Sequence, residues 1–295
     1  MPQNRPHVLL KFFSLFSVVR GYNIVLLAVA QYLAAIYMLN GSKSMRAVFF
    51  DSNLFFIVLS SATSIAAGYI INNFFDRKKD FINRPQKAMI DSMVSDRTKL
   101  LVVAVTSSLA LGLASLVSYR AFLFFGVYIF VMCLYSAFLR RFTILSNIVS
   151  ALLVVTPFLA ITIYNRTFDA VIFVQAFFLL LVLLAKKIVK DLKSMQGDIA
   201  ANLQTIPVRY GVRPSKIFFY SLLLLATTVA IFILSHFSIG NMIYFFNLSI
   251  LIALNLGVLM IRATSSRHFW FIDNAFKIWI VIGVCSLALF DAVIR

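Results

Sequence analysis

The sequence contains no glutamate, and its ten acidic residues are all aspartates. Charge is scarce altogether: charged residues make up 13% of the 295-residue chain, so each cluster of charge is informative. The two cysteines, Cys133 and Cys285, each lie inside an apolar run, which argues against a disulfide framework and gives little support for a metal site. No small-residue cleavage site follows the first apolar run, so we expect no signal peptide.

Apolar residues, by contrast, make up 62% of the chain, and the mean hydropathy is +0.95. A soluble domain is usually about 45–50% apolar, so the excess points to lipid as the surrounding solvent. Runs of about 20 apolar residues are long enough to cross a bilayer as helices, and they lack the short alternation of membrane-spanning strands. Nine runs qualify: 21–39, 53–72, 99–118, 121–139, 143–164, 169–190, 216–235, 241–262 and 270–293. With no linker or low-complexity tract between them, they predict an all-α bundle of nine transmembrane helices in one domain, 1–295.

The net charge of +17 would suggest nucleic acid as the partner of a soluble protein. Here the basic residues lie between apolar runs, so we expect membrane lipids and an anionic substrate, and no nucleic acid. If the N-terminus is cytoplasmic, 21 of the 27 Lys and Arg residues fall on the cytoplasmic side. This asymmetry predicts an integral protein of the cell (inner) membrane, with the N-terminus and the long connections 73–98 and 191–215 cytoplasmic and the C-terminus outside.

Six of the ten aspartates lie in two stretches, and the first follows the second apolar run. If that helix continues, Asn72, Asp76 and Asp80 share one face at i, i+4 and i+8, and Asn73 can join them. Such oxygen ligands suit Mg²⁺. Phosphate-binding cations surround them: Arg77, Lys78, Lys79, Arg84 and Lys87. The alternative is a solvated helix end with mixed charges.

The second stretch follows the sixth apolar run. Asp191, Ser194 and Asp198 fall at i, i+3 and i+7, again on one helical face, and Lys187 and Lys190 precede them at the membrane surface. Taken alone, these lysines would be interpreted as snorkelling to the interface. The topology places both stretches on one side of the membrane, so we favour a shared site that holds a diphosphate through Mg²⁺. The Phe-rich bundle beneath would house a long apolar tail, and aromatic faces would stabilise an allylic cation.

Both segments resemble the motifs of the UbiA superfamily of intramembrane prenyltransferases. The resemblance rests on Asn72-Asn73-Phe-Phe-Asp76-Arg-Lys-Lys-Asp80 with Asn83-Arg84-Pro85 after it, on Lys190-Asp191-Leu-Lys-Ser194-Met-Gln-Gly197-Asp198 with Thr205-Ile-Pro207 after it, and on Arg20-Gly-Tyr-Asn23. Tyr135-Ser136 and Asn147 also fit the family pattern around the fourth and fifth apolar runs. The second motif is similar to that of the geranylgeranylglycerol-phosphate geranylgeranyltransferase branch.

The resemblance implies a nine-helix bundle, Mg²⁺ as cofactor, and a lateral opening to lipid. It implies catalytic and metal-binding roles for four aspartates: Asp76, Asp80, Asp191 and Asp198. We expect the substrate to be bound by Asn23, Asn72, Asn73, Arg77, Lys79, Arg84, Tyr135, Asn147, Lys187, Lys190 and Ser194. Asn73, Ser194 and Lys187 stand where acids are common in the family, which makes this a carboxylate-poor, lysine-rich form of the site.

The predicted function is Mg²⁺-dependent transfer of a prenyl group from a polyprenyl diphosphate to a lipid-phase or phosphate-bearing acceptor. For the branch just named this means geranylgeranyl transfer to a glycerol-phosphate lipid. Alternatives are prenylation of an aromatic quinone precursor or of haem, and a scaffold without catalytic activity. A membrane transporter is disfavoured because charge inside the spans is sparse. A CDP-dependent phosphatidyltransferase is disfavoured because its Asp-Gly-x-x-Ala-Arg signature is absent.

Overall fold

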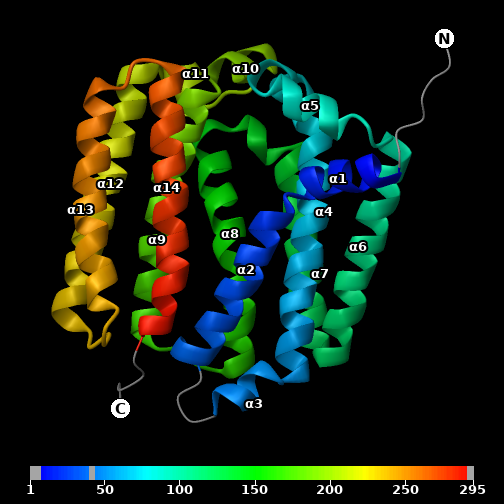
Figure 1. The fold of residues 1–295 in the computed structure, drawn as a ribbon, viewed down its shortest axis with the longest axis vertical. Coiled ribbons are helices and arrows are strands. Elements are labelled where there is room, and N and C mark those ends of the chain that lie inside the picture. The colour runs from blue at the N-terminus through cyan, green and yellow to red at the C-terminus, as the bar shows by residue number, and fades with distance from the viewer. Residues whose placement is uncertain (1–7, 40–43, 291–295) are drawn as a thin grey trace.

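The computed structural model describes residues 8–39 and 44–290, with side chains from Ser14 onward (Figure 1). Apart from one bridge between Gly240 and Phe290, the regular structure in these ranges is helical. The helices are α1 Val8–Val19, α2 Gly21–Leu33 with a π-helical turn Ala34–Met38, α3 Met45–Phe49, α4 Ser52–Asn83, α5 Pro85–Asp91, α6 Asp96–Val117, α7 Tyr119–Ala137, α8 Thr143–Asn165, α9 Ala170–Lys193, α10 Met195–Ala200, α11 Ile206–Tyr210, α12 Val212–His236, α13 Ile243–Arg262 and α14 Ser266–Ser286.

Nine helices within the described ranges are long and apolar enough to cross a membrane. They are α2 with its π-helical turn, α4, α6, α7, α8, α9, α12, α13 and α14, and they match the nine predicted runs one for one. Many of their large apolar side chains face outward: Leu224 and Ile261 are 70% and 68% exposed. Such a surface belongs in lipid, because water would penalise it. The protein is therefore an integral membrane protein, and the predicted fold class is confirmed.

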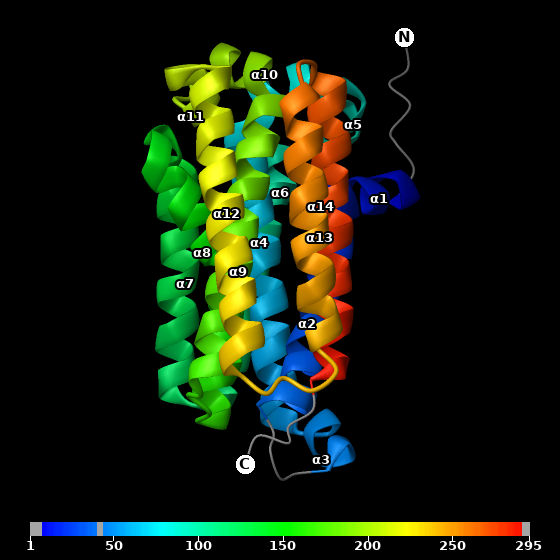
Figure 2. The ribbon, with the colours of Figure 1, turned by 90° about the vertical axis from the view of Figure 1, so that its left-hand side faces the viewer.

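The apolar interior is divided into two clusters, one for each half of the chain. The first joins buried residues of the π-helical turn after α2 and of α3, α4, α6, α7 and α8, and includes Phe125 and Ile161. The second joins α9, α12, α13 and α14, and includes Phe219 and Trp279. Figure 2 shows α9, α12, α13 and α14 running side by side. A site between α4 and α9 therefore lies where the two halves meet.

Helix α4 runs well beyond its apolar segment, as the spacing of Asn72 and Asp76 requires. It ends at Asn83, and Pro85 opens α5, because proline disfavours helical backbone in the residue before it but is tolerated in a first turn. Its extension reaches the end of the bundle that carries α5, α10 and α11 (Figure 1). The two aspartate segments thus lie at the same end, as the Lys and Arg asymmetry predicts.

Candidate active site

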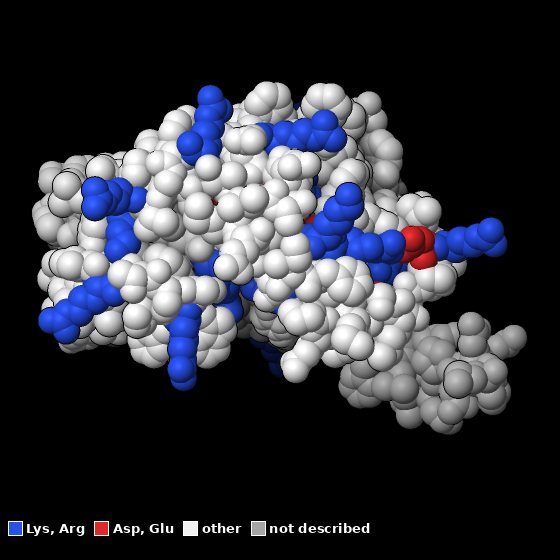
Figure 3. Space-filling view, turned by 90° about the horizontal axis from the view of Figure 1, so that it is seen from above, with Lys and Arg blue, Asp and Glu red and all other residues white. Residues whose placement is uncertain are grey.

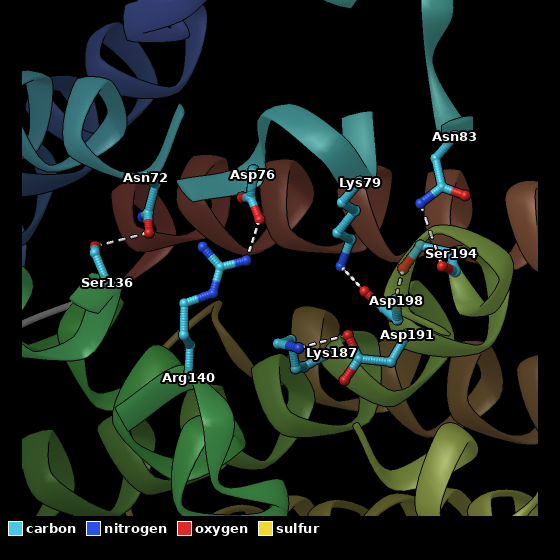
Figure 4. A network of polar contacts seen from close by, with 10 residues as sticks. All are labelled: Asn72, Asp76, Lys79, Asn83, Ser136, Arg140, Lys187, Asp191, Ser194 and Asp198. Atoms are coloured by element: carbon cyan, nitrogen blue, oxygen red, sulfur yellow. Dashed lines mark hydrogen bonds and ion pairs between the residues drawn. The ribbon is translucent and has the colours of Figure 1, made fainter. Parts of the chain in front are cut away.

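The two aspartate segments meet at this end of the bundle (Figure 4). Asn72, Asp76, Lys79 and Asn83 project from one side of α4, since residues three or four apart share a helical face. Facing them are α9 and α10, which do not form one continuous helix: α9 ends at Lys193 and α10 begins at Met195. The expectation that Asp191, Ser194 and Asp198 share one helical face is therefore wrong in detail, although they stay together across the break.

Three ion pairs hold this site together. Asp76 accepts from Arg140, Asp198 pairs with Lys79, and Asp191 pairs with Lys187 at 2.5 Å (Figure 4). The carboxyl groups of Asp191 and Asp198 are fully buried, and that of Asp76 is 24% exposed. Each buried carboxylate thus has one cationic partner, so the three pairs are formally neutral. Burial raises the pKa of Asp198 above the ordinary carboxyl value, while the charge of Lys79 acts against that rise.

A close contact between α4 and α10 sets the position of Asp198. The amide of Asn83 donates to the backbone carbonyl of Ser194 at 3.2 Å, and the Ser194 hydroxyl donates to Asp198 at 3.1 Å. A Cβ at Gly197 would lie 2.1 Å from the Asn83 amide nitrogen and 2.9 Å from the Lys79 carbonyl oxygen. Only glycine permits this approach, which explains the glycine of the second motif.

Several polar atoms of Arg140 and of the predicted site residues are buried and have no hydrogen-bond partner among the described residues. They are Asp191 Oδ2, Arg140 Nη1, and both amide atoms of Asn147. An unpartnered buried polar group costs about 1–3 kcal/mol, so it is uncommon in a finished interior. Here acceptors and donors of this kind occur together, which is the pattern expected where a polar ligand completes the hydrogen bonding.

Lys190 differs from the other lysines of the site, because no hydrogen bond or ion pair to it is found among the described residues. Its side chain is half-buried. The nearby cations Arg20, Lys187 and Lys79 repel its ammonium group, and Asp76 attracts it. An ammonium group in such surroundings is poorly solvated and is repelled by its neighbours. An anion in the site would remove that repulsion, which agrees with the predicted role of Lys190 in binding diphosphate.

Three predicted residues lie apart, toward α5 and α6. Asn73 accepts from Lys99 at 2.8 Å, and Arg77 pairs with Asp96. Asp80 lines a small cavity with Asn73, Arg77 and their neighbours. The cause is the helix period, because eight residues exceed two turns and rotate Asp80 about 80° from Asn72. Lys79 and Asn83 occupy the site face instead. The catalytic role of Asp80 stays a prediction.

The remaining predicted residues contact neighbouring side chains. Asn23 donates to the hydroxyl of Tyr69 at 3.2 Å, and Tyr135 lies near Lys187. Asn72 accepts from Ser136 at 2.8 Å. Arg84, at the end of α4, lies near Lys193.

Sequence reasoning missed Arg140, which it used only to set the membrane orientation. A signal was present: Arg140 follows the fourth apolar run, on the same side of the membrane as both aspartate segments. It also missed Ser136 as a partner of Asn72, and Tyr69, which no motif singles out.

Whether the site can bind Mg²⁺ is judged from the donor atoms that its side chains offer. This ion takes one or two carboxylates and completes its coordination with phosphate oxygens and water. Asp191 Oδ2 is a buried, unpartnered carboxylate oxygen of the required kind. Nowhere in ranges 8–39 and 44–290 do three Asp, His or Cys side chains lie close enough to hold a metal by themselves. The residues therefore fit an ion bound jointly by protein and phosphate, with Asp76, Asp191 and Asp198 as the carboxylates available to it.

The chain is similar in sequence and in fold to known proteins. The model of the UbiA prenyltransferase family matches residues 28–281. The digeranylgeranylglyceryl phosphate synthase of Thermococcus gammatolerans is 35% identical over 162 residues, which cover 54% of this chain and only 57% of that protein. The synthase of the same name from Methanothermobacter thermautotrophicus is 28% identical over 228 residues, covering 74% of this chain and 79% of the relative.

Among solved structures, a UbiA homologue from Archaeoglobus fulgidus bound to DMAPP and Mg²⁺ has the same fold. Its TM-score is 0.66 at 17% identity, and the match covers 92% of this chain and 99% of the homologue. The family match spans most of the chain and includes both aspartate segments. The chain therefore belongs to the UbiA prenyltransferase family, as its two motifs predict.

Proposed function

We propose that this protein is a Mg²⁺-dependent prenyltransferase that moves a prenyl group from a polyprenyl diphosphate to an acceptor. One observation carries the proposal. Three carboxylate–cation pairs lie together at one end of an apolar helical bundle, and among the described residues some buried donors and acceptors there have no hydrogen-bond partner. Family membership and the names of the relatives support it. So does the homologue bound to DMAPP and Mg²⁺.

Binding of the diphosphate would rearrange the ion pairs. Lys79, Arg140 and Lys187 each hold a carboxylate now, and a diphosphate offers them a stronger concentration of negative charge. Among the described residues, Arg140 Nη1 has no hydrogen-bond partner and Lys190 forms no ion pair that it would have to break. As these cations turn to phosphate oxygens, Asp76 and Asp191 become free for a metal. A bound Mg²⁺ would neutralise charge on the leaving diphosphate.

The transfer itself needs little from the protein beyond position and charge. The bond between the allylic carbon and the diphosphate oxygen breaks, and its electron pair leaves with the diphosphate. The acceptor oxygen then bonds to that carbon and loses its proton to water or to the released diphosphate. Lys79, Lys187, Lys190 and Arg140 stabilise the leaving group, because fixed charges in a water-poor site act strongly.

We infer the acceptor from the relatives, whose name is digeranylgeranylglyceryl phosphate synthase. By this inference the donor carries a geranylgeranyl group and the acceptor is a glycerol-phosphate lipid. We also propose that the whole chain acts as one domain of the cell (inner) membrane, with the site facing the cytoplasm. The end of the bundle seen in Figure 3 displays many Lys and Arg side chains and few acidic ones, as a cytoplasmic face should.

The proposal is tested with Asp76→Ala and Asp191→Ala in membranes supplied with a labelled prenyl diphosphate. Both variants should lose Mg²⁺-dependent transfer. The matched control is Asp169→Ala, which removes an exposed aspartate at the start of α9, far from the site. Undiminished transfer in both site variants would overturn the proposal, and tracer flux without chemical conversion would favour a transporter.

A further inference from the structure

Helix α9 carries lysines on two faces, and only one of them belongs to the site described above. Lys187 and Asp191 share the face toward α4 and α10. Lys186, Lys190 and Lys193 follow at i, i+4 and i+7 and share a different face. The proposed reaction uses Lys190 but leaves Lys186 and Lys193 without a role.

The second face meets α14 and the start of α2. Lys193 pairs with Asp273 of α14, and Lys277 lies 3.6 Å from the same carboxylate. Arg20, which precedes α2, is near enough to act on the charges of Lys186 and Lys190. We call this group the cationic flank: Arg20, Lys186, Lys190, Lys193 and Lys277, with Asp273.

Asp273 is the one carboxylate of this flank. It pairs with Lys193 and Lys277, lies near Lys186, and is 3% exposed. In the described part of the chain, neither Arg20 nor Lys186 forms an ion pair. Lysines that only snorkel to the interface keep their ammonium groups in open water. Here Lys186 is half-buried and the side chain of Lys193 is only 10% exposed. Excess positive charge with restricted solvation favours an anion as its counterpart.

The backbone conformation of Arg20 and its contact with Tyr69 fix the position of its side chain. Its backbone is left-handed, with φ 54° and ψ 52°, a conformation that few residues other than glycine adopt. Its guanidinium lies 5.1 Å from the ring centre of Tyr69, whose hydroxyl accepts from Asn23. A strained backbone with a stacked guanidinium holds the side chain between α2 and α4, and a planar guanidinium suits phosphate recognition.

The flank also reaches the outer surface, because the side chain of Lys277 is 45% exposed. A lipid headgroup can therefore approach from the side of the bundle, past α14, without passing through the diphosphate site. A phosphate monoester carries a charge of about −1.5 to −2 at neutral pH, which matches the excess of cations.

We propose that the cationic flank binds the phosphate monoester of a lipid acceptor, separately from the diphosphate site on the other face of α9. The inference rests on the proposed function, since it assigns the acceptor of that reaction. Lys190, between the two faces, would place the acceptor next to the donor.

The test is a binding measurement that needs no catalysis. The protein in phosphatidylcholine nanodiscs, without Mg²⁺ or prenyl diphosphate, is titrated with four probes. They are a 1-O-alkylglycerol 3-phosphate, the same alkylglycerol without phosphate, phosphatidylglycerol, and inorganic phosphate. The monoester lipid should bind at least about tenfold more tightly than each of the others, as charge-assisted hydrogen bonds predict.

Lys186→Met and Arg20→Gln should each weaken binding of the monoester lipid about tenfold, and Lys186→Arg should retain it because the charge stays. The matched control is Arg262→Gln, which removes an exposed charge at the end of α13. Thermal melting of each variant shows that it is folded.

Equal binding of phosphatidylglycerol would mean that the flank only meets bulk headgroups, and equal binding of inorganic phosphate would mean a free-phosphate site. Either result overturns the proposal, as would an equal loss in Arg262→Gln. Absence of prenyl transfer in the unmodified protein would instead contradict the proposed function, and it would leave this binding result intact.

Discussion

The two charged faces of α9 differ in how their charge is balanced. On the face toward α4, each of Asp76, Asp191 and Asp198 has one cation, and the pairs are formally neutral. On the face toward α14, Asp273 is shared by Lys193 and Lys277 and faces a further excess of positive charge. We propose that the first face accepts a metal together with an anion, and that the second accepts an anion alone. On this proposal the same helix separates two kinds of anion binding.

The ion pairs of the described residues also differ in burial: the carboxyl group of Asp191 is fully buried, whereas the Arg77–Asp96 pair is about half exposed. A buried ion pair contributes little net stability but is costly to break, because one charge is left alone in a medium that solvates it poorly. An exposed pair is weak. The variants below use this contrast, in order of decreasing effect.

The largest effect is expected from Arg140→Met. This change leaves Asp76 without its cation and removes the unpartnered Nη1 from the site. We expect transfer to fall about a hundredfold or more, as for loss of a fixed charge that stabilises a leaving group. The control is Arg141→Met, because the neighbouring Arg141 is exposed and lies over Phe138 without an ion pair. Similar losses in both variants, measured as initial transfer rates, would contradict the assignment of Arg140.

Gly197→Ala should have the next largest effect, because its Cβ would meet Asn83 and the α4 backbone. Overpacking of this kind costs about 1–3 kcal/mol, and the displaced Asp198 should lower transfer as well. Gly112→Ala in α6 is the matched change, since a Cβ there meets nothing within 4 Å. In a helix it should stabilise by about 0.5–1 kcal/mol. Thermal unfolding distinguishes the two, and a stabilised Gly197→Ala would show that α10 does not approach α4 closely.

Lys187→Met should destabilise the metal-free protein, because it leaves the buried carboxylate of Asp191 without its cation, and it should also change the metal dependence. The competing cation at Asp191 is removed, so the Mg²⁺ concentration for half-maximal transfer should fall, by about tenfold for a change near 1.4 kcal/mol. Direct Mn²⁺ binding, followed by electron paramagnetic resonance, gives a readout independent of catalysis. An unchanged metal affinity would remove Asp191 from the metal-binding residues.

Asp96→Asn should have the smallest effect. It breaks the ion pair between Asp96 and Arg77, whose side chains are 52% and 49% exposed respectively. Exposed pairs contribute about 0–1 kcal/mol, so unfolding should shift little. A loss as large as that in Gly197→Ala would show that the α5–α6 network supports the site more strongly than its exposure indicates.

The fold could be predicted from the sequence because a helix that crosses lipid must be a long apolar run. Each span is a long apolar run, and the excess of Lys and Arg on one side placed both aspartate segments at one end. The extension of α4 to Asn83 followed from the spacing of Asn72 and Asp76 and from the stop at Pro85. These are local properties, or sums over many residues, and side-chain packing does not decide them.

The partners within the site were not accessible in this way. Arg140 reaches Asp76 from the turn between α7 and α8, and Lys79 reaches Asp198 from another half of the chain. Both pairings therefore depend on how helices are packed. Whether Asp80 shares a face with Asn72 depends on the rotation of about 80° that eight residues accumulate along α4. The helix break at Ser194 coincides with the hydrogen bond from Asn83, and the spacing of Asp191 and Asp198 does not reveal that contact.

The separation of roles between the two faces of α9 is tested most directly by comparing Asp191→Asn with Lys186→Met. Transfer of a labelled geranylgeranyl group is measured with a phosphorylated alkylglycerol and with the same alkylglycerol without phosphate, and products are identified by mass spectrometry. The account predicts that Asp191→Asn loses transfer to both acceptors, while Lys186→Met loses mainly the advantage of the phosphorylated one. Equal losses in both variants with both acceptors would contradict it.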